Sequence, residues 1–120
     1  MRTGRIAFVV VAAALLAVGC SKGKNKETHA YTVRAVVAKA PAAGVVYLHH
    51  EAVPDFIDAF GDKSTMKSMS MGFALGSVDP STVAVGDKVE VHFHTDWDTK
   101  PTLRIDSVKK LPPDTQLDLN

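Results

Sequence analysis

The stretch Val89-Glu90-Val91-His92-Phe93-His94 decides the fold class of this chain. Its apolar and polar residues alternate strictly, and a period of two is typical of a β-strand with one face in a core. The tetrapeptide Val85-Gly86-Asp87-Lys88 directly before it has the composition of a tight turn. The pattern therefore predicts a strand whose apolar side chains point inward and whose histidines lie on the outer face.

Four other runs of the chain show a similar alternation, at 31–38, 44–50, 69–75 and 103–108. Turn-forming segments separate them, among them Pro41-Ala42-Ala43-Gly44 and Asp96-Trp97-Asp98. We expect a bulge near Asp106 in the last run, where the alternation slips by one residue. Residues 51–65 lack a clean alternation and are interpreted as a loop, with room for a short helical turn over 55–60.

Five short strands in one small domain predict an all-β fold. The longest excursions follow the second and third strands, which fits a small five-stranded OB-like barrel. We assign the barrel to residues 31–110 and interpret 111–120 as a polar tail. A domain of this size has a thin core, so a bound metal ion would add usefully to its stability. We expect a monomer.

The first nineteen residues have the pattern of an export signal. Two arginines precede an uncharged apolar run at 6–16, which is too short to span a bilayer comfortably as a mature helix. The run leads into Leu16-Ala17-Val18-Gly19-Cys20, which resembles a bacterial lipobox. We therefore expect a lipoprotein signal segment over 1–19, lipidation of Cys20 and a flexible tether over 20–30. An uncut membrane anchor and a plainly cleaved signal peptide are the alternatives.

Export would change both the net charge and the thiol content of the mature protein. Cys20 is the only cysteine, so a lipidated mature protein has neither a thiol nor an intrachain disulfide. The formal net charge of the whole chain is +1, and the loss of the two arginines of the signal changes it to −1. This balance leaves no large electrostatic footprint for nucleic acid. We expect a protein of the periplasm or cell envelope, held at a membrane by its lipid.

Soft ligands gather in one short segment of the mature chain. All methionines other than Met1 lie in the string Met66-Lys67-Ser68-Met69-Ser70-Met71, and His50 ends the apolar face of an earlier strand. Thioether sulfur and imidazole nitrogen are neutral ligands that suit Cu(I). If the two strands are neighbours, His50 meets the methionines at one end of the barrel. The alternative is that these side chains are ordinary core residues.

Other patterns carry less chemical information. His92 and His94 are two residues apart on one strand face, a spacing that can chelate Zn²⁺ or Cu²⁺, although a solvated strand face has the same pattern. The chain shows no nucleophile–base motif, no glycine-rich phosphate loop and no carboxylate pair with an evident role. We therefore expect a binding protein rather than an enzyme.

Three segments resemble, in the same order, the periplasmic copper-binding family of the CusF type. They are His49-His50-Glu51-Ala52-Val53-Pro54, Met66-x-x-Met69-Ser70-Met71-x-Phe73 and the turn Val85-Gly86-Asp87-Lys88. The resemblance spans about residues 31–108. It implies a five-stranded OB-like barrel that binds Cu(I), and often Ag(I), through one histidine and the methionines of the Met-x-Met string, which here are His50, Met69 and Met71.

Met66 is implied as a further ligand by the same resemblance. It stands where the best-studied family members have a tryptophan that caps the metal through a cation–π contact, and where many relatives have methionine. The stretch 51–65 before it is longer than in the compact members of the family.

The resemblance implies a protein that holds Cu(I) outside the cytoplasm and passes it to an efflux system or to a copper-enzyme assembly partner. A second interpretation is a non-metal OB-type envelope lipoprotein that binds a peptide, a glycan or a protein partner, with the methionines as core residues. A redox or catalytic subunit is a third.

Overall fold

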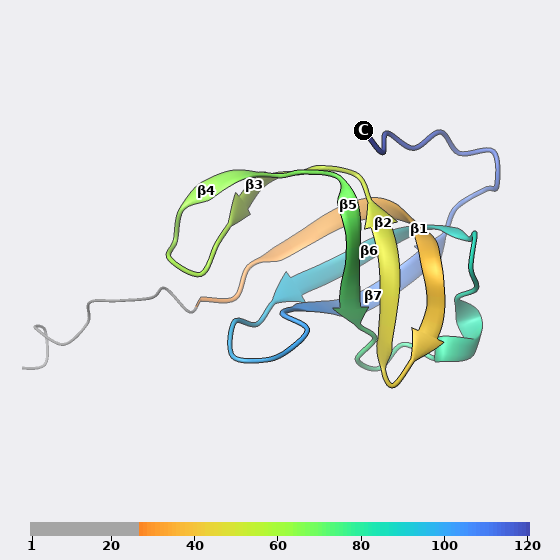
Figure 1. The fold of residues 1–120 in the computed structure, drawn as a ribbon, viewed down its shortest axis with the longest axis horizontal. Helices are drawn as coiled ribbons and strands as arrows, with labels where there is room; N and C mark the ends of the chain where they lie inside the picture. The colour runs from red at the N-terminus through yellow and green to blue at the C-terminus, as the bar shows by residue number, and fades with distance from the viewer. Residues whose placement is uncertain (1–26) are drawn as a thin grey trace, which may run out of the picture.

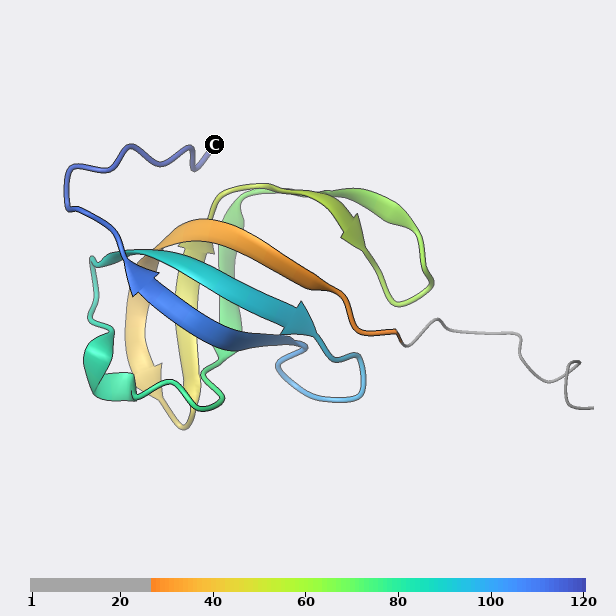
Figure 2. The same ribbon diagram turned by 180° about the vertical axis from the view of Figure 1, so that it is seen from behind.

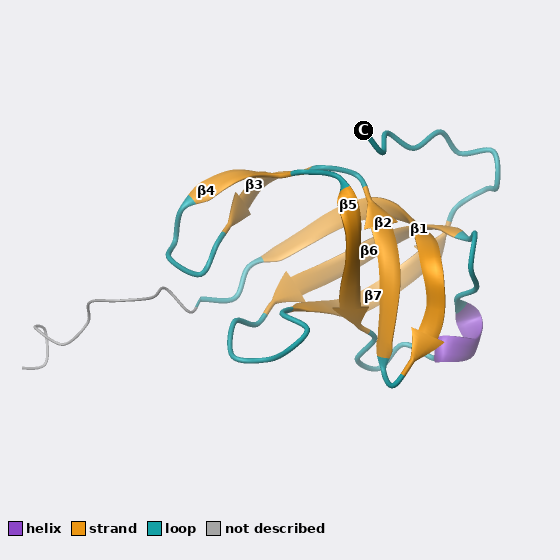
Figure 3. Ribbon diagram, viewed as in Figure 1, coloured by secondary structure: helices purple, strands orange, loops and turns teal. Residues whose placement is uncertain are grey.

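A computed structural model describes residues 27–120 of the chain, so the expected signal segment over 1–19, Cys20 and most of the tether lie outside the described residues. The described part is built of strands, as Figures 1 and 3 show. Their bounds are β1 Ala30–Ala42, β2 Val45–His50, β3 Val53–Ile57, β4 Lys63–Met66, β5 Met69–Ala74, β6 Lys88–Thr95 and β7 Leu103–Lys110. A single turn of 3-10 helix at Pro80–Thr82 interrupts the connection from β5 to β6.

Five of the strands close into a barrel in the order β1-β2-β5-β7-β6, with β6 paired back to β1. Every neighbouring pair is antiparallel except β5 and β7, which run parallel and meet at one pair, Ala74 with Arg104. The barrel is therefore irregular at this seam. The all-β, OB-like five-stranded fold that the sequence predicts is confirmed.

The interior of the barrel follows from the alternation of its strands. On β6, Val89, Val91 and Phe93 are fully buried, whereas His92 between them is exposed. Phe93 meets Phe73 of β5 edge to face, with ring centroids 5.3 Å apart. These two rings are the largest fully buried side chains of the core, and burying one of them contributes about 1.5–3 kcal/mol.

The interpretation of residues 51–65 as a loop with a helical turn is wrong. Strands β3 and β4 pair there as a separate two-stranded hairpin, which Figures 1 and 2 show projecting from one end of the barrel. Asp55 has φ of +57°, which is incompatible with a right-handed helical turn. At the tip, the Asp58 carboxylate accepts hydrogen bonds from the N–H groups of Phe60 and Asp62, and Gly61 has φ of +90°.

Other local predictions are confirmed. His92 pairs with Ser107 and Phe93 pairs with Ile105, which leaves Asp106 as the extra residue of a bulge in β7. The turn before β6 closes through a hydrogen bond from the N–H of Asp87 to the carbonyl of Ala84.

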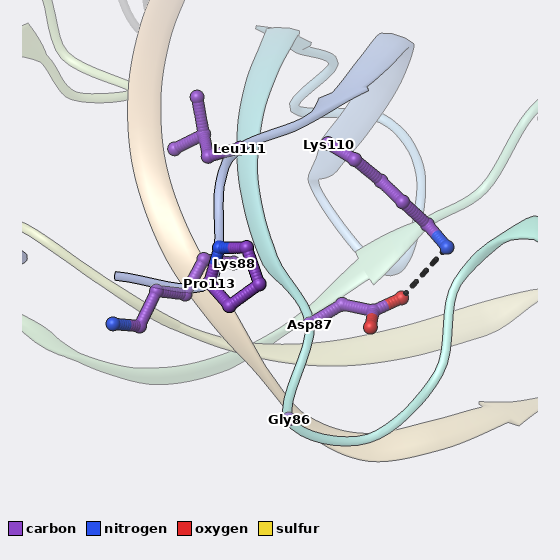
Figure 4. Close-up of a pocket in the computed structure, with 6 residues that line it drawn as sticks. All are labelled: Gly86, Asp87, Lys88, Lys110, Leu111 and Pro113. Atoms are coloured by element: carbon purple, nitrogen blue, oxygen red, sulfur yellow. Dashed lines mark ion pairs between the residues drawn. The ribbon is translucent and has the colours of Figure 1, made fainter. Parts of the chain in front are cut away.

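The tail over 111–120 is held against the barrel. The Lys88 ammonium donates to the Thr115 carbonyl at 2.6 Å, and the Asp118 N–H donates to the Glu51 carboxylate at 2.7 Å. A pocket of about 310 Å³ lies where the tail leaves β7, and Figure 4 shows its lining residues, Gly86, Asp87, Lys88, Lys110, Leu111 and Pro113. The lining contains no histidine, methionine or cysteine, so this pocket offers no soft metal ligand.

Candidate metal site

The register between β2 and β5 brings the predicted ligands together. His50 lies directly opposite Met69, and Leu48 lies opposite Met71. Directly opposed residues of an antiparallel pair point to the same face, with Cβ atoms about 5 Å apart. Leu48 and Phe73 are buried on this face, so it is the face turned to the barrel interior. The expected neighbourhood of His50, Met69 and Met71 is therefore present.

His50 presents one nitrogen with a partner and one without. Its Nδ1 lies 2.6 Å from the carbonyl oxygen of Glu51, so Nδ1–H donates to that carbonyl. Its Nε2 is buried and has no hydrogen-bond partner among the described residues. With the proton on Nδ1, Nε2 carries the free lone pair, and a carbonyl on the other ring nitrogen is how proteins orient a metal-ligating histidine.

Burial keeps this imidazole neutral. The His50 side chain is fully buried, and this burial lowers the pKa of the ring below its ordinary value, although the hydrogen bond to the Glu51 carbonyl acts in the opposite direction. The ring also meets Phe73 edge to face at 6.1 Å. A neutral, fixed imidazole is the form that binds a metal ion.

The three methionines differ in their exposure. Met69, opposite His50, is 39% exposed, whereas Met71 and Met66 are half-buried and pack against the core. Met66, which the sequence places in a loop, is the last residue of β4 and pairs with Val53. Two of the three thioethers are therefore partly buried, and that of Met69, opposite His50, is accessible to solvent.

Two contacts that the sequence did not indicate fix the chain beside His50. The Ser68 hydroxyl donates to the His50 carbonyl at 2.7 Å, which ties the segment between Met66 and Met69 to the end of β2. The Arg34 guanidinium donates two hydrogen bonds, of 2.8 and 2.7 Å, to the Glu51 carboxylate. Alternation alone gives no signal for either contact, because both depend on which strands are neighbours.

The Glu51 carboxylate is held in its charged form. Burial by itself raises the pKa of Glu51, but the hydrogen bonds from Arg34 and from the Asp118 N–H outweigh this effect, and the pKa is lowered. The Arg34 ion pair anchors the Glu51 side chain, and the backbone carbonyl of Glu51 accepts the hydrogen bond from His50.

The structure does not bring His49, His92 or His94 to this site. His92 and His94 lie on β6, where His92 Nδ1 is 2.8 Å from the Thr32 hydroxyl and His94 Nδ1 is 2.9 Å from the Asp106 carboxylate. His49 pairs with Ser70, on the face of β2 opposite to that of His50. Within residues 27–120, no group of three or more His, Cys, Asp or Glu side chains could hold a metal ion. Methionine thioethers are not among those side chains.

Comparison with known proteins adds no relative. No protein-family model, no curated protein and no solved structure matches this chain. Within the described residues, no helix is both long enough and apolar enough to cross a membrane.

Proposed function

We propose that this protein binds Cu(I), and its chemical analogue Ag(I), through His50 Nε2 and the sulfurs of Met69 and Met71, with Met66 as a further thioether ligand. The observation that supports this most is the buried His50 Nε2, which has no hydrogen-bond partner within residues 27–120 and lies on the face that Met69 and Met71 share. A buried polar atom without a partner costs about 1–3 kcal/mol. A metal ion bound to the lone pair would remove that cost.

The ligand set favours a soft, singly charged ion. Imidazole and thioether groups are neutral, so an ion held by them keeps its own charge at a partly buried site, and a +1 ion is cheaper to bury than a +2 ion. Neutral thioethers also bind less tightly than thiolates, which suits a protein that must release its metal. Met69, which is 39% exposed, gives a partner a ligand to approach from solvent.

The biological role that follows is that of a copper chaperone or sequestering protein outside the cytoplasm. In this proposal a lipid on Cys20 anchors the chain to the membrane of the cell envelope, and an efflux system or a copper-enzyme assembly partner receives the metal. Cys20→Ser tests the anchor: the wild type is expected to incorporate a labelled fatty acid and the variant to incorporate none. A wild type that carries no fatty acid would contradict lipidation.

A non-metal envelope lipoprotein that binds a peptide, a glycan or a protein partner is the second candidate. Its support is the packing of Met66 and Met71 against the hydrophobic core, which is what core-filling methionines do. On this interpretation the methionines contribute volume alone.

Isosteric substitution separates the two candidates. Met69→Leu combined with Met71→Leu keeps side-chain volume and removes both sulfurs, so the proposal expects Cu(I) affinity to fall at least tenfold in anaerobic competition with a chromophoric chelator. His92→Gln, on the outer face of β6, serves as the control and leaves the affinity unchanged. Unchanged affinity in the double methionine variant would exclude the proposed site.

A further inference from the structure

The β3–β4 hairpin is inserted between the proposed ligands. It begins shortly after His50, ends shortly before Met69 and carries Met66 as its last residue. Figures 1 and 2 show it alongside the first residues of β1. The position of the hairpin relative to the barrel therefore decides where the Met66 sulfur lies.

Three aromatic side chains, Tyr31, Phe56 and Trp97, hold the hairpin to the barrel. The Phe56 ring of β3 is 5.2 Å from the Tyr31 ring of β1 and 6.2 Å from the Trp97 ring in the loop after β6. The Tyr31 hydroxyl also accepts a hydrogen bond of 2.9 Å from the Ile57 N–H. We call this group the aromatic latch. Its barrel side is fixed, because Tyr31 also contacts the fully buried Phe93 at 5.5 Å.

The aromatic latch holds the outer part of the hairpin, and Val53, which is 2% exposed, anchors the hairpin base in the core. The hairpin strands have five and four residues, and the register between them shifts between Val53 and Phe56. A two-stranded hairpin of this size is at best marginally stable in water without packing against other elements. The apolar side chain at its tip, Phe60, is 70% exposed and contributes no such packing.

We infer that the aromatic latch positions Met66 for the metal, so that Tyr31 and Phe56 are positioning residues of a site they do not line. This inference rests on the proposed function. An undocked hairpin removes Met66 from the site while His50, Met69 and Met71 remain on the barrel. Since such coupling is reciprocal, a bound metal that uses Met66 also stabilises the docked hairpin.

A double-mutant cycle with Ag(I) as the probe tests the inference. Phe56→Ala is expected to weaken Ag(I) binding about tenfold, within the usual range for coupled sites. In a Met66→Leu background the same change is expected to have no further effect, because the ligand that the latch positions is already gone. Phe56→Tyr, which keeps the ring, is expected to bind Ag(I) as the wild type does. Phe60→Ala, at the tip of the hairpin, is expected to leave the affinity unchanged.

Trp97 supplies a second readout that needs no metal. It is the only tryptophan of the chain, so its fluorescence reports directly on hairpin docking. The emission of metal-free Phe56→Ala is expected to shift to the red as the indole becomes hydrated, and saturating Ag(I) is expected to reverse part of the shift only when Met66 is present. If Phe56→Ala does not fold, Tyr31→Phe tests the latch by removing only the hydroxyl that Ile57 uses.

The outcomes separate this inference from the proposed function. A wild-type protein that binds no Ag(I) overturns the proposed function and, with it, the inference. A wild type that binds Ag(I), with Phe56→Ala lowering the affinity equally whether Met66 is kept or replaced by leucine, overturns the inference alone. Loss of affinity only where Met66 is kept supports both.

Discussion

His50 illustrates how the backbone orients one side chain. The Glu51 carbonyl accepts a hydrogen bond from Nδ1–H, and the strand register places the side chain on the interior face that Met69 and Met71 share. Both effects come from the fold itself, so the proposed ligand is already oriented when an ion binds. Because the ring is already ordered, binding an ion there costs little further side-chain entropy.

At the residue scale we predict that Met71→Leu separates packing from chemistry. Leucine is close to methionine in volume, so the free energy of unfolding should change by less than about 1.5 kcal/mol, while Cu(I) affinity falls. Leu48→Ala, which removes the buried neighbour opposite Met71, should instead cost about 2–5 kcal/mol. Denaturant unfolding of the metal-free proteins measures both values. An equally large loss of stability in Met71→Leu would favour a purely structural methionine.

The sequence predicted the strand faces of the proposed ligands well but not their surroundings. Alternation placed His50, Met69 and Met71 on apolar faces, because that needs only a period of two. The pairing of Glu51 with Arg34 and the bond from Ser68 to His50 join residues far apart in sequence, and a single chain carries no local signal for them.

At the element scale, close packing across the β5–β7 seam depends on one glycine. Gly76 has φ of +61°, and a Cβ built there would lie 2.9 Å from the Ile105 carbonyl oxygen. The register between β5 and β7 has one pair, Ala74–Arg104. A shift of the backbone at Gly76 would therefore loosen the seam.

We predict that Gly76→Ala destabilises the protein more than Gly86→Ala does. Both positions have positive φ, but a Cβ at Gly86 would meet nothing within 4 Å. Gly86→Ala should therefore cost only the backbone strain, about 1 kcal/mol, and Gly76→Ala should cost about a further 1 kcal/mol for the collision. Thermal unfolding compares the two, and an equal loss of stability would show that the seam adjusts freely.

The turn between the 3-10 helix and β6 should make the stability of the protein depend on pH. The Asp87 carboxylate accepts a hydrogen bond from the Ala84 N–H and lies 3.3 Å from the Lys110 ammonium. The Ala84 N–H, followed by Lys110, lowers the pKa of Asp87 below its ordinary value. A carboxyl with a lowered pKa stabilises the fold above its unfolded pKa of about 4, and that stabilisation disappears as the pH falls through the folded pKa.

Asp87→Asn should therefore be less stable than the wild type at neutral pH, and the difference should shrink as the pH falls below about 4. Denaturant unfolding at a series of pH values measures it. A difference that stays constant down to the lowest pH at which both proteins fold would mean that the charge of Asp87 does not stabilise the turn.

The elements also show where prediction from the sequence fails. Strands with clean alternation were identified, and the Asp106 bulge was visible as a slip in the pattern. The β3–β4 hairpin was missed because Pro54 and the positive φ of Asp55 break its alternation. Its Phe56 packs against Tyr31 and Trp97, which are distant in sequence.

At the scale of the whole molecule, a thin core makes stability sensitive to ligand. With Ag(I) free at about a hundred times its dissociation constant, the native state gains about 2.7 kcal/mol. For a domain of this size that corresponds to a rise in Tm of about 10–20 °C. The variant with Met69→Leu and Met71→Leu should show a much smaller rise at the same Ag(I) concentration. Equal rises in both proteins would place the bound ion elsewhere.

The most direct test of the account is the X-ray absorption spectrum of the Cu(I)-loaded protein at the copper K-edge. The proposed site predicts a Cu(I) edge with one imidazole nitrogen and two or three sulfur atoms in the first shell, and loss of sulfur scattering when Met69 and Met71 are replaced by leucine. A first shell of nitrogen and oxygen atoms alone in the wild type would contradict the proposed thioether site.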